Sequence, residues 1–81
     1  MRYKVVVREY SMLAGWYDVN YFVLENNEEL VNLYLRLTQG NPNSEEADRE
    51  KWIRKKIADG ISSFKWSKND NRSYRVDPLE G

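Results

Sequence analysis

The sequence predicts one small α+β domain, residues 1–81, in which a single antiparallel sheet made of two hairpins carries two helices on one face. Three observations predict this class. Apolar and polar residues alternate near both ends of the chain, a segment in the middle has a broad apolar helical face, and a more polar helical segment follows a Gly- and Asn-rich loop. The expected order is ββααββ.

The first two strands are predicted over residues 2–10 and 18–25, and a hairpin is the simplest way to pair them. In the first strand, the apolar and charged side chains fall on opposite faces: Tyr3, Val5 and Val7 on one, and Arg2, Lys4 and Arg8 on the other. In the second strand, the large apolar side chains of Tyr21 and Phe22 point to opposite faces. We therefore expect this strand to be covered on both sides or central in its sheet. The connection around Gly15 is expected to be a loop that contains Trp16 and Tyr17.

The first helix is predicted over residues 27–39, with Gly40 as its stop signal. Its apolar face is the widest in the sequence and comprises Leu30, Leu33, Tyr34 and Leu37, flanked by Val31 and Leu35. Asn26 can cap the first free N–H groups, with Glu29 as its capping-box partner. This helix is therefore expected to cover the core.

The second helix is predicted over residues 44–59, capped by Asn43 or Ser44 and closed by Gly60. Ile53 and Ile57 form a narrow apolar stripe, so this helix should lie on the surface with a thin contact seam.

A second hairpin is predicted at the C-terminal end, with strands over residues 61–67 and 72–77 and a polar turn between them. Pro78 is expected to end the last strand, because proline cannot donate a hydrogen bond to a neighbouring strand.

Composition restricts the chemistry that the chain can perform. Thirteen basic and thirteen acidic residues cancel, so no overall field attracts the chain to nucleic acid or to an anionic membrane. Histidine and cysteine are absent, which excludes a histidine base, a cysteine nucleophile and a His/Cys metal site. We expect a soluble cytoplasmic protein that needs no cofactor or metal, that binds no membrane and that is not an enzyme.

Aromatic residues give the remaining functional signal. Trp52 lies off the Ile53/Ile57 stripe among charged residues, which predicts that its indole is at least partly exposed. Exposed aromatic side chains beside basic ones are typical of protein interfaces. The candidate interface comprises Trp16, Tyr17, Arg49, Trp52 and Lys56. A structural role is the alternative: Trp52 would cover a sheet edge and Trp16 would close one end of the core.

The runner-up hypothesis is a face that binds single-stranded nucleic acid. If both hairpins share one sheet, its outer face carries several cations and one aromatic ring: Arg2, Lys4, Arg8, Phe22, Lys65 and Arg75. Lysine and arginine also keep solvated sheet faces soluble, and no recognised RNA-binding motif accompanies these residues. The preferred interpretation is therefore a small protein-binding regulator or inhibitor, of the kind that phages and mobile elements encode.

Overall fold

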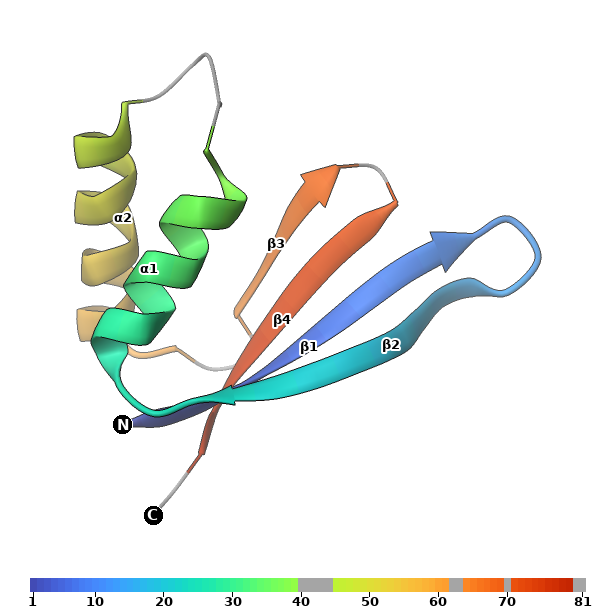
Figure 1. Ribbon diagram of the computed structural model, residues 1–81, viewed down its shortest axis with the longest axis horizontal. Helices are drawn as coiled ribbons and strands as arrows, with labels where there is room; N and C mark the ends of the chain where they lie inside the picture. Colours follow the sequence, from blue (N-terminus) through green and yellow to red (C-terminus); the bar gives the residue numbers. More distant parts are fainter. Residues whose placement is uncertain (40–44, 62–63, 70, 80–81) are drawn as a thin grey trace.

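The computed structural model describes residues 1–39, 45–61, 64–69 and 71–79. The elements follow one another as β1 (Arg2–Ser11), β2 (Gly15–Leu24), α1 (Asn27–Leu37), α2 (Glu46–Asp59), β3 (Phe64–Asn69) and β4 (Arg72–Leu79) (Figure 1). The α+β class and the order of two strands, two helices and two strands are those that the sequence predicts.

The four strands form one antiparallel sheet in the order β2-β1-β4-β3. The two hairpins join because the first strand of the chain pairs with the last. In this register Val5 lies between Phe22 of β2 and Val76 of β4, and Val76 in turn pairs with Phe64 of β3. Four apolar residues therefore form one row across the sheet, on the side that faces the helices.

The helix α1 lies over one face of the sheet, and α2 packs beside α1 (Figure 1). The second helix reaches the sheet at its edge strand, where the rings of Trp52 and Phe64 are 5.6 Å apart. The core lies between α1 and the sheet and comprises Tyr3, Val5, Leu30, Leu33, Ile61, Tyr74 and Val76. Since the helices cover one face, no described helix or strand lies over the opposite face of the sheet, which we call the open face.

Local hydrogen bonds form at both ends of the first helix. The side chain of Asn26 accepts a hydrogen bond from the Glu29 N–H (2.9 Å), as predicted. The Glu29 carboxylate accepts from the N–H of Glu25 (2.6 Å), whereas a capping box would use the N–H of Asn26, one residue later. The helix ends at Leu37, two residues earlier than predicted, and the Thr38 hydroxyl donates to the Tyr34 carbonyl (2.7 Å). Gly40 lies outside the described residues.

The second helix begins at Glu46, two residues later than predicted, and its N-cap is Glu45, which makes no side-chain capping hydrogen bond. The predicted caps Asn43 and Ser44 lie outside the described residues. Its end at Asp59 is as predicted, because Gly60 has a φ of +100°, in the left-handed region where other residues are strained.

Six strand boundaries differ from the prediction, and three of the differences are small: β1 ends at Ser11, β2 at Leu24 and β3 at Asn69. β2 begins at Gly15 (φ +71°), so Trp16 and Tyr17 lie in a strand rather than in a loop. β3 is described from Phe64 rather than from residue 61. β4 continues to Leu79 through Pro78, which pairs with Tyr3 beyond the last β3–β4 pair. Proline is tolerated there because one side of β4 is already an edge.

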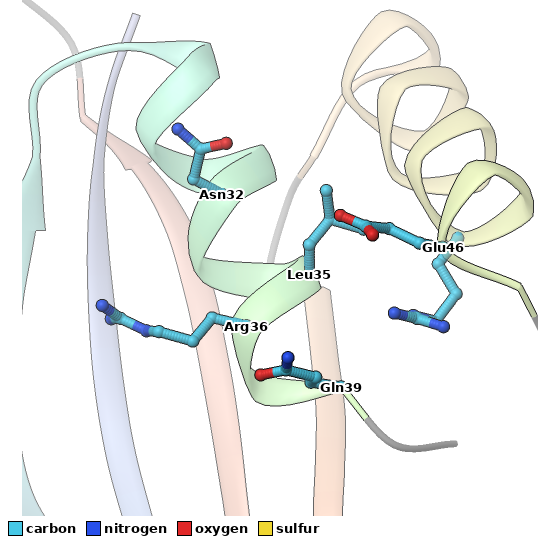
Figure 2. Close-up of a pocket in the computed structure, with 6 residues that line it drawn as sticks. Asn32, Leu35, Arg36, Gln39 and Glu46 are labelled. Carbon is cyan, nitrogen blue, oxygen red and sulfur yellow. The ribbon is translucent and has the colours of Figure 1, made fainter. Parts of the chain in front are cut away.

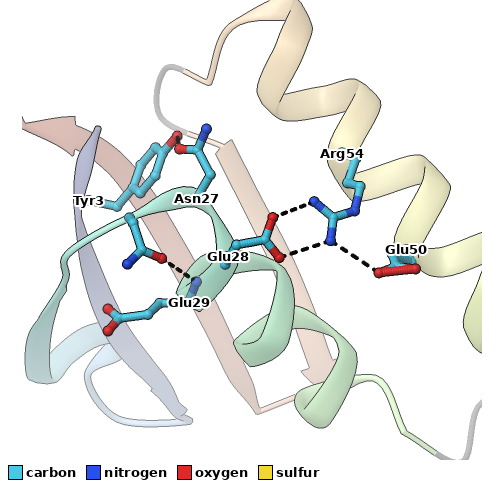
Figure 3. A network of polar contacts seen from close by, with 7 residues as sticks. Tyr3, Asn27, Glu28, Glu29, Glu50 and Arg54 are labelled. Carbon is cyan, nitrogen blue, oxygen red and sulfur yellow. Dashed lines mark hydrogen bonds and ion pairs between the residues drawn. The ribbon is translucent and has the colours of Figure 1, made fainter.

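Two polar links join the first helix to its neighbours (Figure 3). The Tyr3 hydroxyl of β1 donates to Asn27 Oδ1 (2.6 Å), and burial raises the pKa of this tyrosine. Across the helices, the Arg54 guanidinium donates to both carboxylate oxygens of Glu28 (2.8 and 3.0 Å) and to Glu50 (3.2 Å). The bidentate pair therefore links α1 to α2 at the surface of the molecule.

The Glu28–Arg54 pair should make stability depend on pH. Its hydrogen bonds with Arg54, supported by the positive charge, lower the pKa of Glu28 from its usual 4.5. A carboxyl whose pKa falls on folding stabilises the fold above its unfolded pKa, and this contribution is lost as the pH drops through the folded pKa. Carboxyl NMR titration should therefore give a pKa below 4.5 for Glu28 that returns to the ordinary value in Arg54→Gln. An unchanged Glu28 titration in that variant would contradict the pairing.

Candidate functional site

The β1–β2 hairpin is longer than the rest of the sheet. The last β1–β4 pair is Glu9 with Arg72, after which the Tyr10 N–H still donates to the Asn71 carbonyl (2.9 Å). Residues 10–16 continue as a two-stranded ribbon that projects from the molecule, and Tyr17, opposite Glu9, lies at its base (Figure 1). We call residues 10–17 the hairpin tip.

The hairpin tip carries large apolar side chains that the chain does not cover. Leu13 is 100% exposed and Met12 94%, and both lie at the turn itself. One step behind them are the partly exposed rings of Tyr10, Trp16 and Tyr17. Proteins that act alone rarely expose large apolar groups in this way. Exposed apolar patches commonly mark interaction sites, which makes the hairpin tip a candidate.

Local contacts give the hairpin tip a defined shape. The Leu13 N–H donates to Ser11 Oγ (3.2 Å), and Gly15 supplies the left-handed conformation that closes the turn. The rings of Tyr10 and Trp16 pair across the strands with centroids 5.6 Å apart. The two apolar side chains at the turn are therefore presented by an ordered ribbon.

The base of the hairpin tip is electrically balanced. Arg8 Nε lies 3.0 Å from Asp18 Oδ1, and Arg72 Nη2 lies 2.8 Å from Glu9 Oε1. Residues 10–17 themselves carry no charge. A partner that docks here is consequently attracted by apolar contact rather than by a net field.

The structure divides the predicted protein interface into two separate surfaces. Trp16 and Tyr17 belong to the hairpin tip, whereas Arg49, Trp52 and Lys56 lie on α2 at the opposite side of the molecule (Figure 1). The five residues thus cannot form one contact patch within a single chain.

Trp52 is 46% exposed, and the prediction that its indole is at least partly exposed is confirmed. It also has structural neighbours: its ring stacks on Tyr34 at 5.4 Å and lies 5.6 Å from Phe64, and Lys56 Nζ sits over both Trp52 and Phe64. These contacts support the alternative in which Trp52 covers a sheet edge.

Arg49 is a buried residue and not an exposed interface cation. Its Nε donates to Thr38 Oγ1 (3.0 Å), which ties the start of α2 to the end of α1. The sequence did not indicate this burial, because Arg49 lies on the charged first half of the helix.

All five predicted cations of the nucleic-acid face lie on the open face of the sheet. Their side chains alternate with the core row on β1, β4 and β3 and comprise Arg2, Lys4, Arg8, Lys65 and Arg75. The prediction for Phe22 is wrong, since it pairs with Val5 and packs against the core under the helices. Tyr21 takes the corresponding position on the open face, with Lys4 Nζ 4.8 Å from its ring centre.

Three of these five cations have acidic partners. Arg2 pairs with Glu25 (3.2 Å), Arg8 with Asp18 (3.0 Å) and Arg75 with Asp77 (3.1 Å). The open face is therefore of mixed charge, and its phosphate-binding capacity is much smaller than the sequence alone indicates.

A hollow of about 230 Å³ lies between α1 and α2 (Figure 2). Side chains of both helices line it: Asn32, Leu35, Arg36, Gln39, Glu46 and Arg49. Its one carboxylate, Glu46, has no second carboxylate beside it in this lining, so the hollow lacks the paired acid and base that general acid–base chemistry commonly uses.

Within the described ranges no group of three acidic side chains could hold a metal ion, and no helix is long and apolar enough to cross a membrane.

Sequence reasoning missed the two most exposed apolar residues, Met12 and Leu13. The signal was present in the segment SMLAG, where a hairpin turn carries apolar residues at positions that are commonly polar.

Comparisons of the chain with protein-family models, with curated proteins and with solved structures found no match.

Proposed function

We propose that this protein is a small non-enzymatic binding module, a cytoplasmic regulator or inhibitor, that occupies a surface on a larger protein through its hairpin tip. The observation that supports the proposal most is the exposure of Met12 and Leu13 at the end of an ordered ribbon. Composition supports it as well, because the chain lacks the histidine and cysteine side chains on which much enzyme chemistry depends.

The shape of the hairpin tip favours a particular kind of partner surface. A narrow ribbon with apolar side chains at its end fits a concave apolar pocket better than it fits a flat surface. Burying Leu13 or Met12 fully would stabilise a complex by about 1.5–3 kcal/mol each. The rings of Tyr10, Trp16 and Tyr17 would line the mouth of that pocket, since aromatic residues are enriched where a contact is partly wet.

The charge distribution favours protein over nucleic acid as the partner. The hairpin tip has no cation to contact phosphate, and the arginines behind it, Arg8 and Arg72, are each paired with a carboxylate. The five cations of the open face keep nucleic-acid binding as a second hypothesis. A fluorescent single-stranded oligonucleotide at low salt tests it: retention that weakens with salt and in a Lys4→Gln/Lys65→Gln variant would support that hypothesis.

The test of the main proposal compares Leu13→Asp with the wild-type protein. Because Leu13 is fully exposed, the substitution should change stability by about 0.5 kcal/mol or less. It should place a charge in the apolar contact and lower the affinity for the partner by about tenfold or more, which corresponds to about 1.4 kcal/mol. Capture from lysate identifies candidate partners, and calorimetry on the purified partner measures the affinity.

The matched control is Trp52→Ala, which alters the other predicted surface. A partner retained by Trp52→Ala and lost by Leu13→Asp supports docking at the hairpin tip. A partner that Trp52→Ala loses and Leu13→Asp retains would place the interface on α2. Retention of the wild-type protein by uncharged lipid vesicles would assign the hairpin tip to a membrane surface instead.

A further inference from the structure

We propose that two copies of this chain join antiparallel through their β2 strands, so that the two four-stranded sheets become one continuous sheet. The proposal concerns a different surface from the hairpin tip and does not depend on the function proposed above. It starts from the sheet order, which leaves β2 at one edge with no strand paired to its outer side among the described residues.

The chemistry of β2 is that of a strand that is covered rather than solvated. Its ten residues, GWYDVNYFVL, contain one charged residue, Asp18, and neither lysine nor proline. The other edge strand differs clearly, because β3 has Lys65 and Lys68 among six residues. Natural sheets use lysine, proline and charge to prevent edge pairing, so β3 is protected by this means and β2 is not.

The part of β2 that suits pairing is its second half. A bulge places Val19 opposite no residue of β1, since Val7 pairs with Asn20 and Arg8 with Asp18. Bulges twist an edge and hinder pairing, so the regular segment begins after it. That segment, Asn20–Leu24, has no charged residue.

The outer edge of this segment has a backbone donor that a new strand can use. The Tyr21 N–H donates to the neighbouring side-chain oxygen, Asn20 Oδ1 (2.8 Å), rather than to β1. This local bond satisfies the amide in the single chain, and a carbonyl of an added strand can replace it.

Both sides of the β2 edge offer apolar surface to an added strand. On the open face, Tyr21 is 62% exposed, and it borders a shallow hollow of about 330 Å³ whose lining is mixed: Val6, Val19 and Asn20 with the charged residues Lys4, Asp18 and Arg75. On the helix side, a hollow of about 460 Å³ is lined by Phe22, Leu24 and Leu33 beside the polar residues Glu29, Asn32 and Arg36 of α1. Side chains of an added strand point alternately to the two faces and would lie beside Tyr21 on the open face and beside Phe22 and Leu24 on the helix side.

A second copy fits this edge better than an unrelated strand for two reasons. Directly paired residues of antiparallel strands share a face, so the exposed Tyr21 and Val23 of one copy meet the same residues of the other. The only charge of the strand, Asp18, lies before the paired segment, so the two copies of Asp18 stand at opposite ends and do not oppose each other. A two-fold pairing also closes on itself and leaves the lysine-bearing β3 strands outermost.

A five-residue strand pairing buries less surface than a permanent dimer requires, so the association should depend on concentration. Sedimentation equilibrium between about 10 µM and 1 mM should show a mass that rises from 9.7 kDa toward twice that value. Tyr21→Lys should remain folded, because Tyr21 is exposed, and should weaken dimerisation by about tenfold or more. A wild-type protein that stays monomeric over this range would overturn the proposal.

The matched control is Leu13→Lys, which adds the same charge at the hairpin tip. It should dimerise as the wild type does, whereas equal loss in both variants would indicate that added charge alone disperses the protein and would refute pairing at β2. Loss of dimer in Leu13→Lys alone would assign self-association to the hairpin tip. The two proposals therefore fail separately, since Tyr21→Lys should still bind the partner that Leu13→Asp loses.

The absence of cysteine allows a direct test of the geometry. A spin label on Leu13→Cys reports the distance between the two hairpin tips in the dimer. Antiparallel pairing directs the tips away from each other and should give no short distance. A dimer in which the labels lie close together would contradict an antiparallel β2 interface.

Discussion

Leu30→Ala is expected to lower the free energy of unfolding by about 2–5 kcal/mol, a large part of the stability of a domain this small. Leu30 is 0% exposed and packs in the cluster between α1 and the sheet. Its removal costs both transfer free energy and the cavity that remains, because neighbours such as Val5 and Val76 are held in paired strands and can move little. For a domain of this size the melting midpoint should fall by about 10 °C or more.

The matched control is Leu13→Ala, the same substitution at a fully exposed site. It should leave the midpoint within a few degrees, since a surface change is worth about 0.5 kcal/mol or less. Circular dichroism melts of the two variants measure the difference. Equal midpoints for Leu30→Ala and Leu13→Ala would show that α1 does not cover the core.

The second large effect is expected at Trp66, where the outcome should depend strongly on the replacement. Trp66 contacts three aromatic rings, with centroid distances of 5.2 Å to Tyr74, 5.4 Å to Tyr34 and 5.7 Å to Phe64. Trp66→Ala removes all of these contacts and should cost about 3–5 kcal/mol.

Trp66→Phe should cost less than Trp66→Ala, because it removes part of the ring system instead of all of it. The indole Nε1 is buried and has no hydrogen-bond partner among the described residues. A buried unsatisfied donor is destabilising, so phenylalanine removes that cost while it keeps a ring against Tyr74. Chemical denaturation of both variants measures the two costs. A Trp66→Phe variant as unstable as Trp66→Ala would mean that the N–H has an acceptor in solution.

The elements of the fold were predictable because they depend on local periodicity. The wide apolar face of α1 and the alternation in β1 each follow from residues close in sequence, and the structure places both on the core. The position of β2 was not predictable by the same means. Tyr21 and Phe22 are both large and apolar, so the sequence indicated a covered or central strand, whereas the structure places β2 at an edge with Tyr21 largely exposed.

The candidate site was predictable only in part, and for a related reason. The helical position of Trp52 correctly indicates exposure. Its stacking on Tyr34 and its tilted contact with Phe64 depend on how α2 lies against α1 and β3, which no local pattern encodes. Likewise, the pairing of Arg8 with Asp18 depends on the register of the first hairpin. Charges counted in the sequence therefore overstated the basic character of the sheet face.

The overhang of the β1–β2 hairpin has a consequence for how tightly it can hold a partner. Beyond the Tyr10–Asn71 hydrogen bond no third strand of the described residues pairs with the ribbon, and two strands alone are marginally stable in water. Its amides can therefore exchange with solvent through local fraying while the four-stranded part remains closed. Binding must suppress this motion, which subtracts conformational entropy from the contact energy and favours fast release. A cross-link that stiffens the ribbon would remove this cost and lengthen the lifetime of the complex.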